Sequence, residues 1–321
     1  MIFDEIYALV QNSRDIAIFT HQNSDGDAIG SSIALKLALE KMGKSVAIFV
    51  QKPIHRNYNC LGVKDNINCT KPKKFDLAIG IDCPNKKRFG IYEKKFDSIA
   101  KSIAIDHHVD FENYADVNYG DSKCSSACLM VYRMFRHWKV EFDSDIAKCL
   151  YAGMATDTGR FNYGYLNSEV FDAVSYLYSV GFDFLDINYQ LFQRQSFNQV
   201  ELFKRGINGC KFFDNNKIAI VRLDEKDFVE TGTQPNETFV IMDYIKNIET
   251  VEIACVLTQD KEQEYMVSIR TRKLNAQTIA KTFGGGGHLR ASGCRIFTQG
   301  DEAFSQLLDV CRQELKSPHR V

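Results

Sequence analysis

The stretch His21-Gln22-Asn23-Ser24-Asp25-Gly26-Asp27 decides the fold. It follows an apolar run at residues 16–20 and precedes an amphipathic segment at residues 28–42, which ends at Gly43. This order is typical of a buried strand, a tight loop and a helix. The loop is therefore expected at the C-terminal end of a strand, which is the edge where open α/β sheets bind ligands.

The residue types in this loop suit a metal ion. Imidazole and carboxylate ligands together favour Mn²⁺, Zn²⁺ or Fe²⁺. Asp25 and Asp27 are two residues apart, and Gly26 lets the loop bend between them, so the two carboxylates can face neighbouring ions. The alternative is a polar turn that caps the next helix, because Asp and Ser do this routinely. For this stretch alone the two interpretations are evenly balanced.

Two more apolar runs end in residues of the same chemistry. The run at residues 76–81 ends at Asp82, and the run at residues 102–105 ends at Asp106-His107-His108. Independent helix caps are not expected to place His and Asp at the same sheet edge three times. The pattern therefore favours a metal site. Asp157, in an Asp-Thr-Gly run near a predicted break in regular structure, is a fourth carboxylate that carries little weight alone.

Composition limits the class of protein. A length of 321 residues predicts about two domains, and 45% hydrophobic with 25% charged residues is typical of a soluble globular chain. A net charge of −1 excludes a broad basic field for long nucleic acid, so a polyanionic substrate should be short or held locally. Ten cysteines without a repeated CxxC pair indicate reduced thiols. No apolar run could span a bilayer and the N-terminus carries acids, so we expect a cytoplasmic protein without a membrane partner.

The chain order predicts an α/β protein with two domains. Residues 1–183 should form a mainly parallel sheet flanked by helices. Residues 184–208 should form a helical linker, because this segment has no Pro and no Gly before Gly206. Residues 209–321 should form a smaller α/β domain with a mixed sheet, including a hairpin of strands at 251–258 and 264–270. A cleft is expected between the two domains.

A run of four glycines, Gly284 to Gly287, precedes His288 in the predicted second domain. Glycine backbones can approach a ligand closely, and their N–H groups can form an anion nest. Neither the dinucleotide-binding nor the P-loop pattern fits this run. A flexible loop is the alternative, but it does not explain the adjacent His288, so phosphate or nucleotide binding is favoured. Arg270 ends the preceding strand and can bind phosphate with its forked guanidinium, unless it is only a surface arginine.

With these motifs in order, the sequence resembles the DHH phosphoesterases over nearly its whole length. The family's His-x-x-x-Asp-x-Asp motif is matched by His21, Asp25 and Asp27, and its later strand-end Asp by Asp82. The remaining motifs match Asp106-His107-His108, Asp157-Thr158-Gly159 and, in the associated C-terminal domain, Gly285-Gly286-Gly287-His288. One departure is Ser24, where many members have Pro, which alters loop stiffness but no ligand.

The resemblance implies a phosphoesterase with two divalent ions, usually Mn²⁺. One ion would be held by His21, Asp25 and Asp82, and the other by Asp27, Asp82, His107 and Asp157, with Asp82 bridging. His108 would contact the substrate phosphate or orient a ligand, and Asp106 would position a histidine. The second domain would close over the substrate, with Arg270, the glycines Gly285, Gly286 and Gly287, and His288 binding phosphate or the terminal nucleotide.

Within the family, the chain resembles the bacterial nanoRNase group, which degrades short oligoribonucleotides to mononucleotides and often dephosphorylates 3′-phosphoadenosine 5′-phosphate. The glycine motif distinguishes the chain from the pyrophosphatases of the family. Its size distinguishes it from the longer RecJ-like exonucleases, and the lack of an apolar run that could span a bilayer distinguishes it from the membrane-bound cyclic-dinucleotide phosphodiesterases. A stand-alone phosphodiesterase for cyclic di-AMP or linear dinucleotides is the alternative. A catalytically silent nucleotide-binding regulator is a third hypothesis, which the complete ligand set disfavours. A homodimer is compatible with these features.

Overall fold

The computed structural model describes residues 1–68, 74–162 and 164–317, which divide into two compact units, Met1–Arg194 and Gln195–Val321. The predicted linker at 184–208 is not one continuous helix. Helix α8 (Phe184–Asn188) and the π-helical turn η3 (Tyr189–Gln193) belong to the first unit, whereas α9 (Phe197–Asn208) belongs to the second. Ser196 caps α9 with a capping box, so a new helix begins there.

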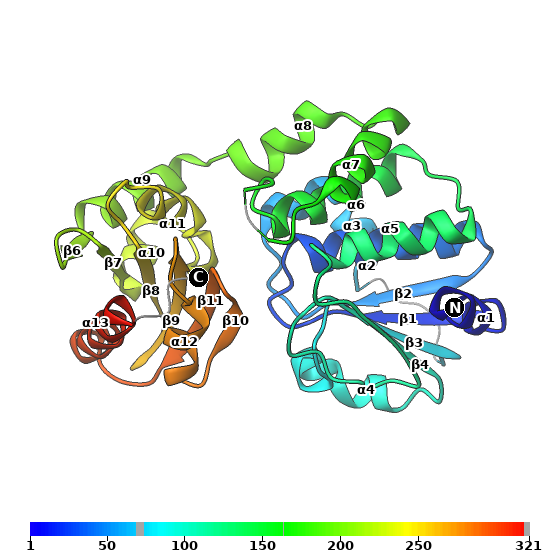
Figure 1. Cartoon of the computed structure of the whole chain (residues 1–321), viewed down its shortest axis with the longest axis horizontal. Helices are drawn as coiled ribbons and strands as arrows, with labels where there is room; N and C mark the ends of the chain where they lie inside the picture. Colours follow the sequence, from blue (N-terminus) through cyan, green and yellow to red (C-terminus); the bar gives the residue numbers. More distant parts are fainter. Residues whose placement is uncertain (69–73, 163, 318–321) are drawn as a thin grey trace. The chain divides into compact units, whose positions relative to one another are not determined.

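The first unit contains the predicted parallel sheet, with strand order β2-β1-β3-β4-β5 (Figure 1). Its strands are β1 (Asp15–Phe19), β2 (Ser45–Phe49), β3 (Leu77–Ile81), β4 (Ser102–Asp106) and β5 (Val117–Gly120). Its other helices are α1 (Ile2–Gln11), α2 (Gly26–Lys41), η1 (Arg56–Leu61), α3 (Val63–Asn66), η2 (Lys86–Tyr92), α4 (Glu93–Asp97), α5 (Ala127–Trp138), α6 (Ser144–Asp157) and α7 (Ser168–Val180). Strand β5 was not predicted, because it is only four residues long and only Val117 is buried.

Both faces of this sheet are covered, which explains why its central strand, β3, is apolar at every position. Helices α2, α5 and α6 lie on one face, and α4 lies on the other (Figure 1). On the α4 side, Phe19, Phe89 and Phe96 pack together with ring centroids 4.9–5.8 Å apart. The two layers fix the sheet edge from which the loops after β1, β3 and β4 emerge.

Helices α2 and α6 approach each other unusually closely. A Cβ atom added to Gly30 of α2 would lie 2.4 Å from the carbonyl oxygen of Cys149 in α6. A Cβ added to Gly153 of α6 would lie 2.1 Å from Cys128 Sγ and 2.7 Å from Asp27 Oδ1. Only glycine allows this approach, which brings the start of α2 next to the end of α6.

The second unit is built on a six-stranded sheet of order β10-β11-β9-β8-β7-β6, in which only β7 and β8 pair in parallel. Its strands are β6 (Lys211–Phe213), β7 (Ile218–Leu223), β8 (Ile253–Lys261), β9 (Glu264–Thr271), β10 (Gly286–His288) and β11 (Ala291–Ile296). Its other helices are α10 (Glu225–Thr231), η4 (Pro235–Glu237), α11 (Phe239–Lys246), α12 (Ala276–Thr282) and α13 (Gly300–Lys316). The predicted mixed sheet and the β8–β9 hairpin are confirmed.

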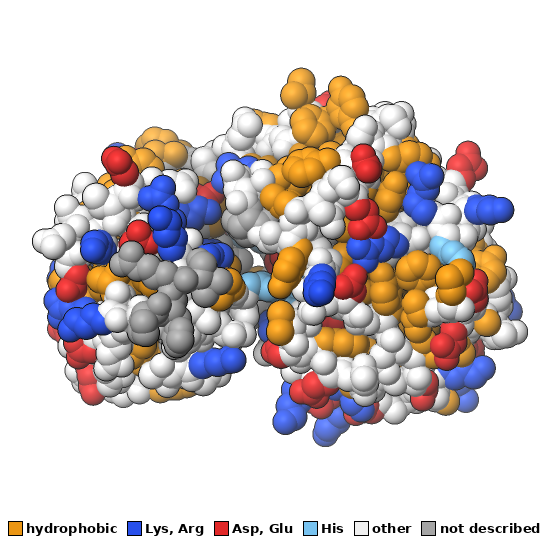
Figure 2. Space-filling view, in the orientation of Figure 1, with side chains coloured by type: hydrophobic (Ala, Val, Ile, Leu, Met, Phe, Trp, Pro, Cys, Tyr) orange, Lys and Arg blue, Asp and Glu red, His pale blue; other side chains and the backbone are white. Residues whose placement is uncertain are grey.

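The surface matches the near-neutral composition. On the face drawn in Figure 2, basic and acidic side chains are interspersed on each unit. The described cysteines are all free thiols, and most of them are buried. Within the described residues, no helix combines the length and the apolar character needed to cross a membrane.

The close helix contact gives a stability prediction. Gly30→Ala should lower the free energy of unfolding of the first unit by about 1–3 kcal/mol, because the backbone carbonyl of Cys149 cannot move aside. The matched control is Gly209→Ala at the end of α9, where φ is −86° and the nearest atom to the added Cβ would be the Arg205 carbonyl oxygen at 3.3 Å. Urea denaturation followed by circular dichroism measures both variants. A Gly30→Ala protein as stable as the wild type would contradict the packing described here.

Candidate metal centre

Three neighbouring strands end at the same edge of the first sheet, and each is followed by His or Asp. His21 lies two residues beyond β1, Asp82 directly follows β3, and Asp106 is the last residue of β4, before His107 and His108. Because β1, β3 and β4 are parallel and adjacent, these side chains meet. Asp82 and Asp106 are almost completely buried, and His21 and His107 are 5% exposed, whereas Asp25 at the rim of the cluster is exposed.

The loop after β1 serves both predicted roles, as a helix cap and as a source of carboxylates. Asp25 is the N-cap of α2, and its Oδ1 accepts hydrogen bonds from the backbone N–H groups of Asp27 (3.0 Å) and Ala28 (3.1 Å). Asp27 is buried in the first turn of α2. Its two oxygens accept hydrogen bonds from the N–H groups of Ala127 (2.6 Å) and Cys128 (2.9 Å) at the start of α5. These free helix-terminal donors hold the Asp27 carboxylate in place.

The donor atoms form two groups that share Asp82. In the first group, His21 Nε2 lies 3.6 Å from Asp82 Oδ2 and 4.0 Å from Asp25 Oδ1. In the second, His107 Nε2 lies 3.5 Å from Asp82 Oδ1 and 3.7 Å from Asp27 Oδ2. Asp157, the last residue of α6, places its Oδ2 3.4 Å from the same His107 nitrogen. The structure therefore brings together all six residues that the sequence predicted as metal ligands.

Both histidines point Nε2 into the cluster and use Nδ1 elsewhere. His21 Nδ1 lies 2.8 Å from the carbonyl oxygen of Gln22, and His107 Nδ1 lies 3.3 Å from that of Cys124. A neutral imidazole that donates from Nδ1 to a carbonyl keeps a lone pair on Nε2, as metal-binding histidines do.

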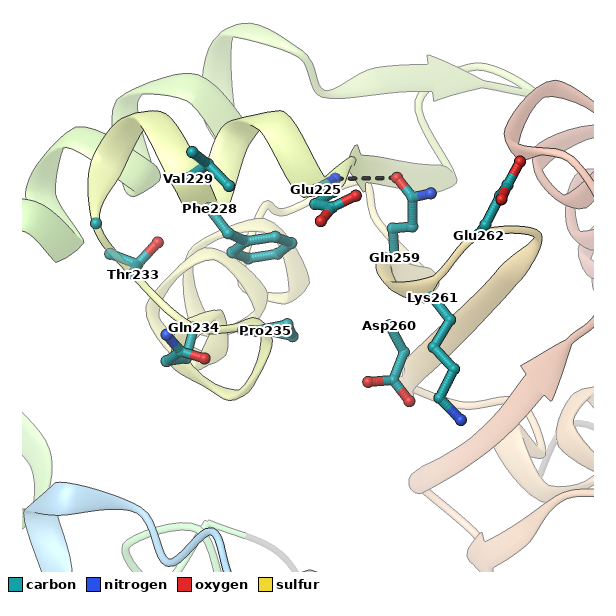
Figure 3. Close-up of a pocket in the computed structure, with 11 residues that line it drawn as sticks. Glu225, Phe228, Val229, Thr233, Gln234, Pro235, Gln259, Asp260, Lys261 and Glu262 are labelled. Atoms are coloured by element: carbon teal, nitrogen blue, oxygen red, sulfur yellow. Dashed lines mark hydrogen bonds between the residues drawn. The ribbon is translucent and has the colours of Figure 1, made fainter.

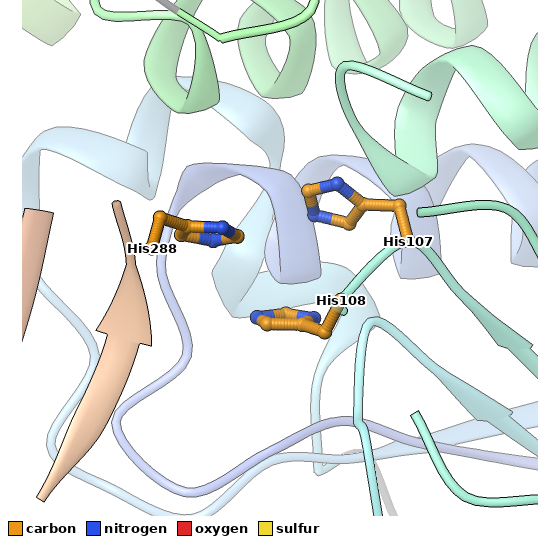
Figure 4. A group of neighbouring side chains, drawn as sticks. All are labelled: His107, His108 and His288. Atoms are coloured by element: carbon orange, nitrogen blue, oxygen red, sulfur yellow. The ribbon is translucent and has the colours of Figure 1, made fainter. Parts of the chain in front are cut away.

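His108 is held differently, by Asp106. Asp106 Oδ1 accepts hydrogen bonds from the backbone N–H of His108 (2.6 Å) and from its Nδ1 (2.7 Å). The rings of His107 and His108 are 4.9 Å apart and tilted by 54° (Figure 4). Asp106 and Asp82 raise the pKa of His108 although burial opposes them, which favours the protonated imidazolium form.

The backbone at Asp82 is strained. Its φ is +52°, in the left-handed region that few non-glycine residues adopt at a cost of about 1–3 kcal/mol. The N–H group of Asp82 donates to the carbonyl of Ile105 at 2.9 Å, which extends the β3–β4 pairing by one residue. This geometry turns the Asp82 carboxylate into the cluster.

The electrostatics of the cluster show an excess of negative charge. Burial, together with Asp82 and Asp157, raises the pKa of Asp27 well above its usual value, and burial raises that of Asp157 to about 7. Burial opposes ionisation of Asp82 too, but His107 and His21 hold its pKa well below the usual range. Within the described part of the chain, the buried Oδ1 of Asp82 and Oδ2 of Asp106 accept no hydrogen bond. Divalent cations would neutralise this charge, and the mixed carboxylate and imidazole donors fit Mn²⁺, Zn²⁺ or Fe²⁺.

In the second unit, the predicted substrate-binding residues lie at one end of the sheet. Arg270 of β9 pairs in register with Ala291 of β11, which pairs with His288 at the end of β10. Arg270 and His288 therefore occupy one row, two strand spacings or about 10 Å apart. His288 is also drawn in Figure 4.

Two of the four N–H groups in the glycine run are used within the fold, and an anion nest there stays a prediction. The N–H groups of Gly284 and Gly285 donate to the carbonyls of Lys281 (3.0 Å) and Ala280 (2.9 Å), and so they end α12. Gly286 and Gly287 then begin β10, which pairs with β11. A Cβ on Gly285 would lie 2.2 Å from the Gly293 carbonyl oxygen, so close backbone packing requires glycine there.

The second unit also has a hollow of about 570 Å³ between α10 and the turn of the β8–β9 hairpin (Figure 3). Phe228 and Pro235 line it together with Gln259, whose Oε1 accepts a hydrogen bond of 2.9 Å from the N–H of Glu225. None of the predicted substrate-binding residues lines this hollow.

The sequence did not predict the support that α5 gives to Asp27, a contact across 100 residues. The available signal was Ser126, which caps α5 by accepting a hydrogen bond from the N–H of Leu129 at 3.1 Å. The Ser126 cap locates the start of α5, but it does not show that this helix end contacts Asp27.

Comparisons with known proteins agree with this architecture. Residues 15–154 match the DHH family N-terminal domain, and residues 215–317 match the DHHA1 domain. The chain is 26% identical to the "Probable bifunctional oligoribonuclease and PAP phosphatase NrnA" of Streptococcus mutans over 97% of this chain and 99% of that protein. It is 25% identical to the bifunctional oligoribonuclease and PAP phosphatase NrnA of Bacillus subtilis, over 93% and 95% of the two chains.

Among solved structures, an exopolyphosphatase-related protein from Bacteroides fragilis has the same fold, with a TM-score of 0.88 and 24% identity over 97% of this chain and 96% of that one. The two domain matches occupy the two units in order and include the strand-end cluster of the first. The chain therefore belongs to the DHH family, with an N-terminal DHH domain followed by a DHHA1 domain.

Proposed function

We propose that this protein is a phosphoesterase that uses two divalent ions, most simply Mn²⁺, to hydrolyse short oligoribonucleotides to mononucleotides and to dephosphorylate 3′-phosphoadenosine 5′-phosphate. One observation carries the proposal: Asp82 presents one oxygen to the His21 group and the other to the His107 group. The relatives named as oligoribonuclease and PAP phosphatase support the substrate class.

Under this proposal, His21, Asp25 and Asp82 hold one ion, and Asp27, Asp82, His107 and Asp157 hold the other. Two such ions would supply a water of lowered pKa and would neutralise the phosphate charge. His108, whose Nδ1 is held by Asp106, would contact an oxygen of the substrate phosphate. Arg270 and His288 of the second unit bind the nucleotide.

The first prediction from this proposal concerns the shared ligand. Asp82→Ala should lower kcat by at least about 10²–10³-fold, because both ions lose a bond and the transition state loses their stabilisation. The folded state should persist, since the Asp82 side chain contributes charge rather than apolar packing. Turnover of a dinucleotide and manganese content are the measurements, with Asp97→Ala, a surface residue paired with Lys86, as the control. Near-normal turnover by Asp82→Ala would rule out a bridging role.

The second concerns pH. The neighbouring Asp82 and Asp25 outweigh burial and raise the pKa of His21 to about 9, so this ring is protonated at neutral pH in the metal-free protein. A cation at Nε2 must displace that proton. Manganese affinity should therefore rise with pH through neutrality and level off above about pH 9, with proton release on binding.

Calorimetric titration of the metal-free protein with Mn²⁺, in buffers of different ionisation enthalpy, measures this release. His137→Asn is the matched control, because His137 pairs with Asp4 away from the cluster. Affinity independent of pH, without proton release, would contradict the assignment of His21 as a ligand.

The third concerns substrate length. A net charge of −1 offers little for long RNA, so binding energy should come from the terminal nucleotide and the phosphates near the ions. Two- to five-nucleotide RNAs should therefore be turned over much faster than a twenty-four-nucleotide RNA. His288→Ala should lower kcat/KM for a dinucleotide about tenfold or more, the effect of one hydrogen bond to a charged phosphate.

These rates are measured at two salt concentrations, with 3′-phosphoadenosine 5′-phosphate and cyclic di-AMP as further substrates. Manganese content of His288→Ala should equal that of the wild type. Faster turnover of the longest RNA with a steep salt dependence would refute the length preference. Cyclic di-AMP as the best substrate would favour the alternative phosphodiesterase.

A further inference from the structure

Arg88 lies beside the candidate metal centre, and its side chain has no role in the metal binding or catalysis proposed for this centre. It belongs to η2, six residues after Asp82. Its carbonyl oxygen accepts a hydrogen bond of 2.6 Å from the N–H of Gln22, the residue after His21. The backbone that carries Arg88 is therefore joined directly to the loop that carries His21.

Arg88 is partly buried as a residue, and its guanidinium forms no ion pair and no hydrogen bond with any residue that the structure describes. Arg133 of the same unit is also half-buried, and its guanidinium pairs with both Asp121 (2.7 Å) and Glu169 (2.6 Å). Among the neighbours of Arg88 in η2, Lys86 is neutralised by Asp97 at 2.7 Å. The guanidinium of Arg88, unlike that of Arg133, is therefore available to bind an anion from outside the chain.

The charge of Arg88 reaches the strand ends. For His21, burial and Arg88 both lower the pKa, against the carboxylates that raise it. For the buried thiol of Cys83, burial raises the pKa and Arg88 lowers it. Arg88 is therefore close enough to the ends of β1 and β3 for its charge to act on His21 and Cys83, and it pairs with none of the cluster's carboxylates.

We propose that Arg88 is a phosphate-binding residue, whose guanidinium holds an oxygen of the substrate phosphate on the His21 side of the centre. A guanidinium suits this role because its planar fork can donate two parallel hydrogen bonds to phosphate and stays charged at any working pH. The inference rests on the proposed function and names a residue within the DHH domain itself that recognises the substrate.

The test compares Arg88→Gln and Arg88→Lys with the control Arg14→Gln. Arg14 is an exposed arginine at the opposite, N-terminal end of β1. Binding of AMP to the manganese-loaded protein is measured by calorimetry, and KM and kcat are measured with a dinucleotide. Arg88→Gln should raise both the Kd for AMP and the KM about 10–100-fold, the effect of hydrogen bonds to a charged group.

Arg88→Lys should recover part of this loss, because it keeps the charge and loses the fork. Manganese content and melting temperature of both variants should match the wild type, since the Gln22 contact uses only the Arg88 backbone. Arg14→Gln should bind AMP normally.

Two results would overturn the inference. One is AMP affinity and KM within about twofold of the wild type in Arg88→Gln, and the other is loss of manganese or of stability in both Arg88 variants, which would show a structural role. Failure of the wild type to hydrolyse any dinucleotide would instead refute the proposed function. The AMP titration tests Arg88 in either case.

Discussion

The carboxylate of Asp82 is the constraint on which the first domain depends. It lies between two imidazoles, 3.6 Å from His21 and 3.5 Å from His107, which come from the strands on either side of β3. This placement requires β3 to be flanked by β1 and β4, all parallel, and requires a left-handed backbone at Asp82. The apolar strands and the covering helices produce that arrangement. Their packing explains why a buried, highly charged cluster can persist in an otherwise ordinary α/β domain.

Few groups within the cluster compensate its negative charge. The start of α5 stabilises Asp27, and Asp106 turns His108, but Asp27 and Asp157 still have raised pKa values without a cation. Burying carboxylates together is unfavourable unless cations or protons compensate. The site is therefore better suited to binding divalent ions and an anionic substrate than to stabilising the fold.

Much of this site was predictable because its signals are local. His21, Asp82 and His107 follow short apolar runs, and parallel strands align the ends of such runs without further information. The Asp25 cap leaves the metal interpretation open, since only Oδ1 of Asp25 accepts the two capping hydrogen bonds. The assignment of roles to Arg270 and His288 stays a prediction.

Some of the parts that were missed had a local signal. The break within 184–208 arises at Ser196, where a capping box with Gln199 starts α9 in the second unit. The glycine run ends α12 and enters a strand, because Gly285 must pack against Gly293. The proposed role of Arg88 was not predicted from the sequence either. It depends on the finding that no acidic side chain among the described residues pairs with Arg88, and only the fold shows this.

The most direct test of the account is the anomalous diffraction of crystals soaked in Mn²⁺. Two manganese peaks should appear about 3.5–4 Å apart, with an oxygen of Asp82 bound to each ion, His21 on one and His107 on the other. A single ion that is bound without Asp82, or manganese only on surface carboxylates, would contradict the claim that Asp82 joins two metal sites.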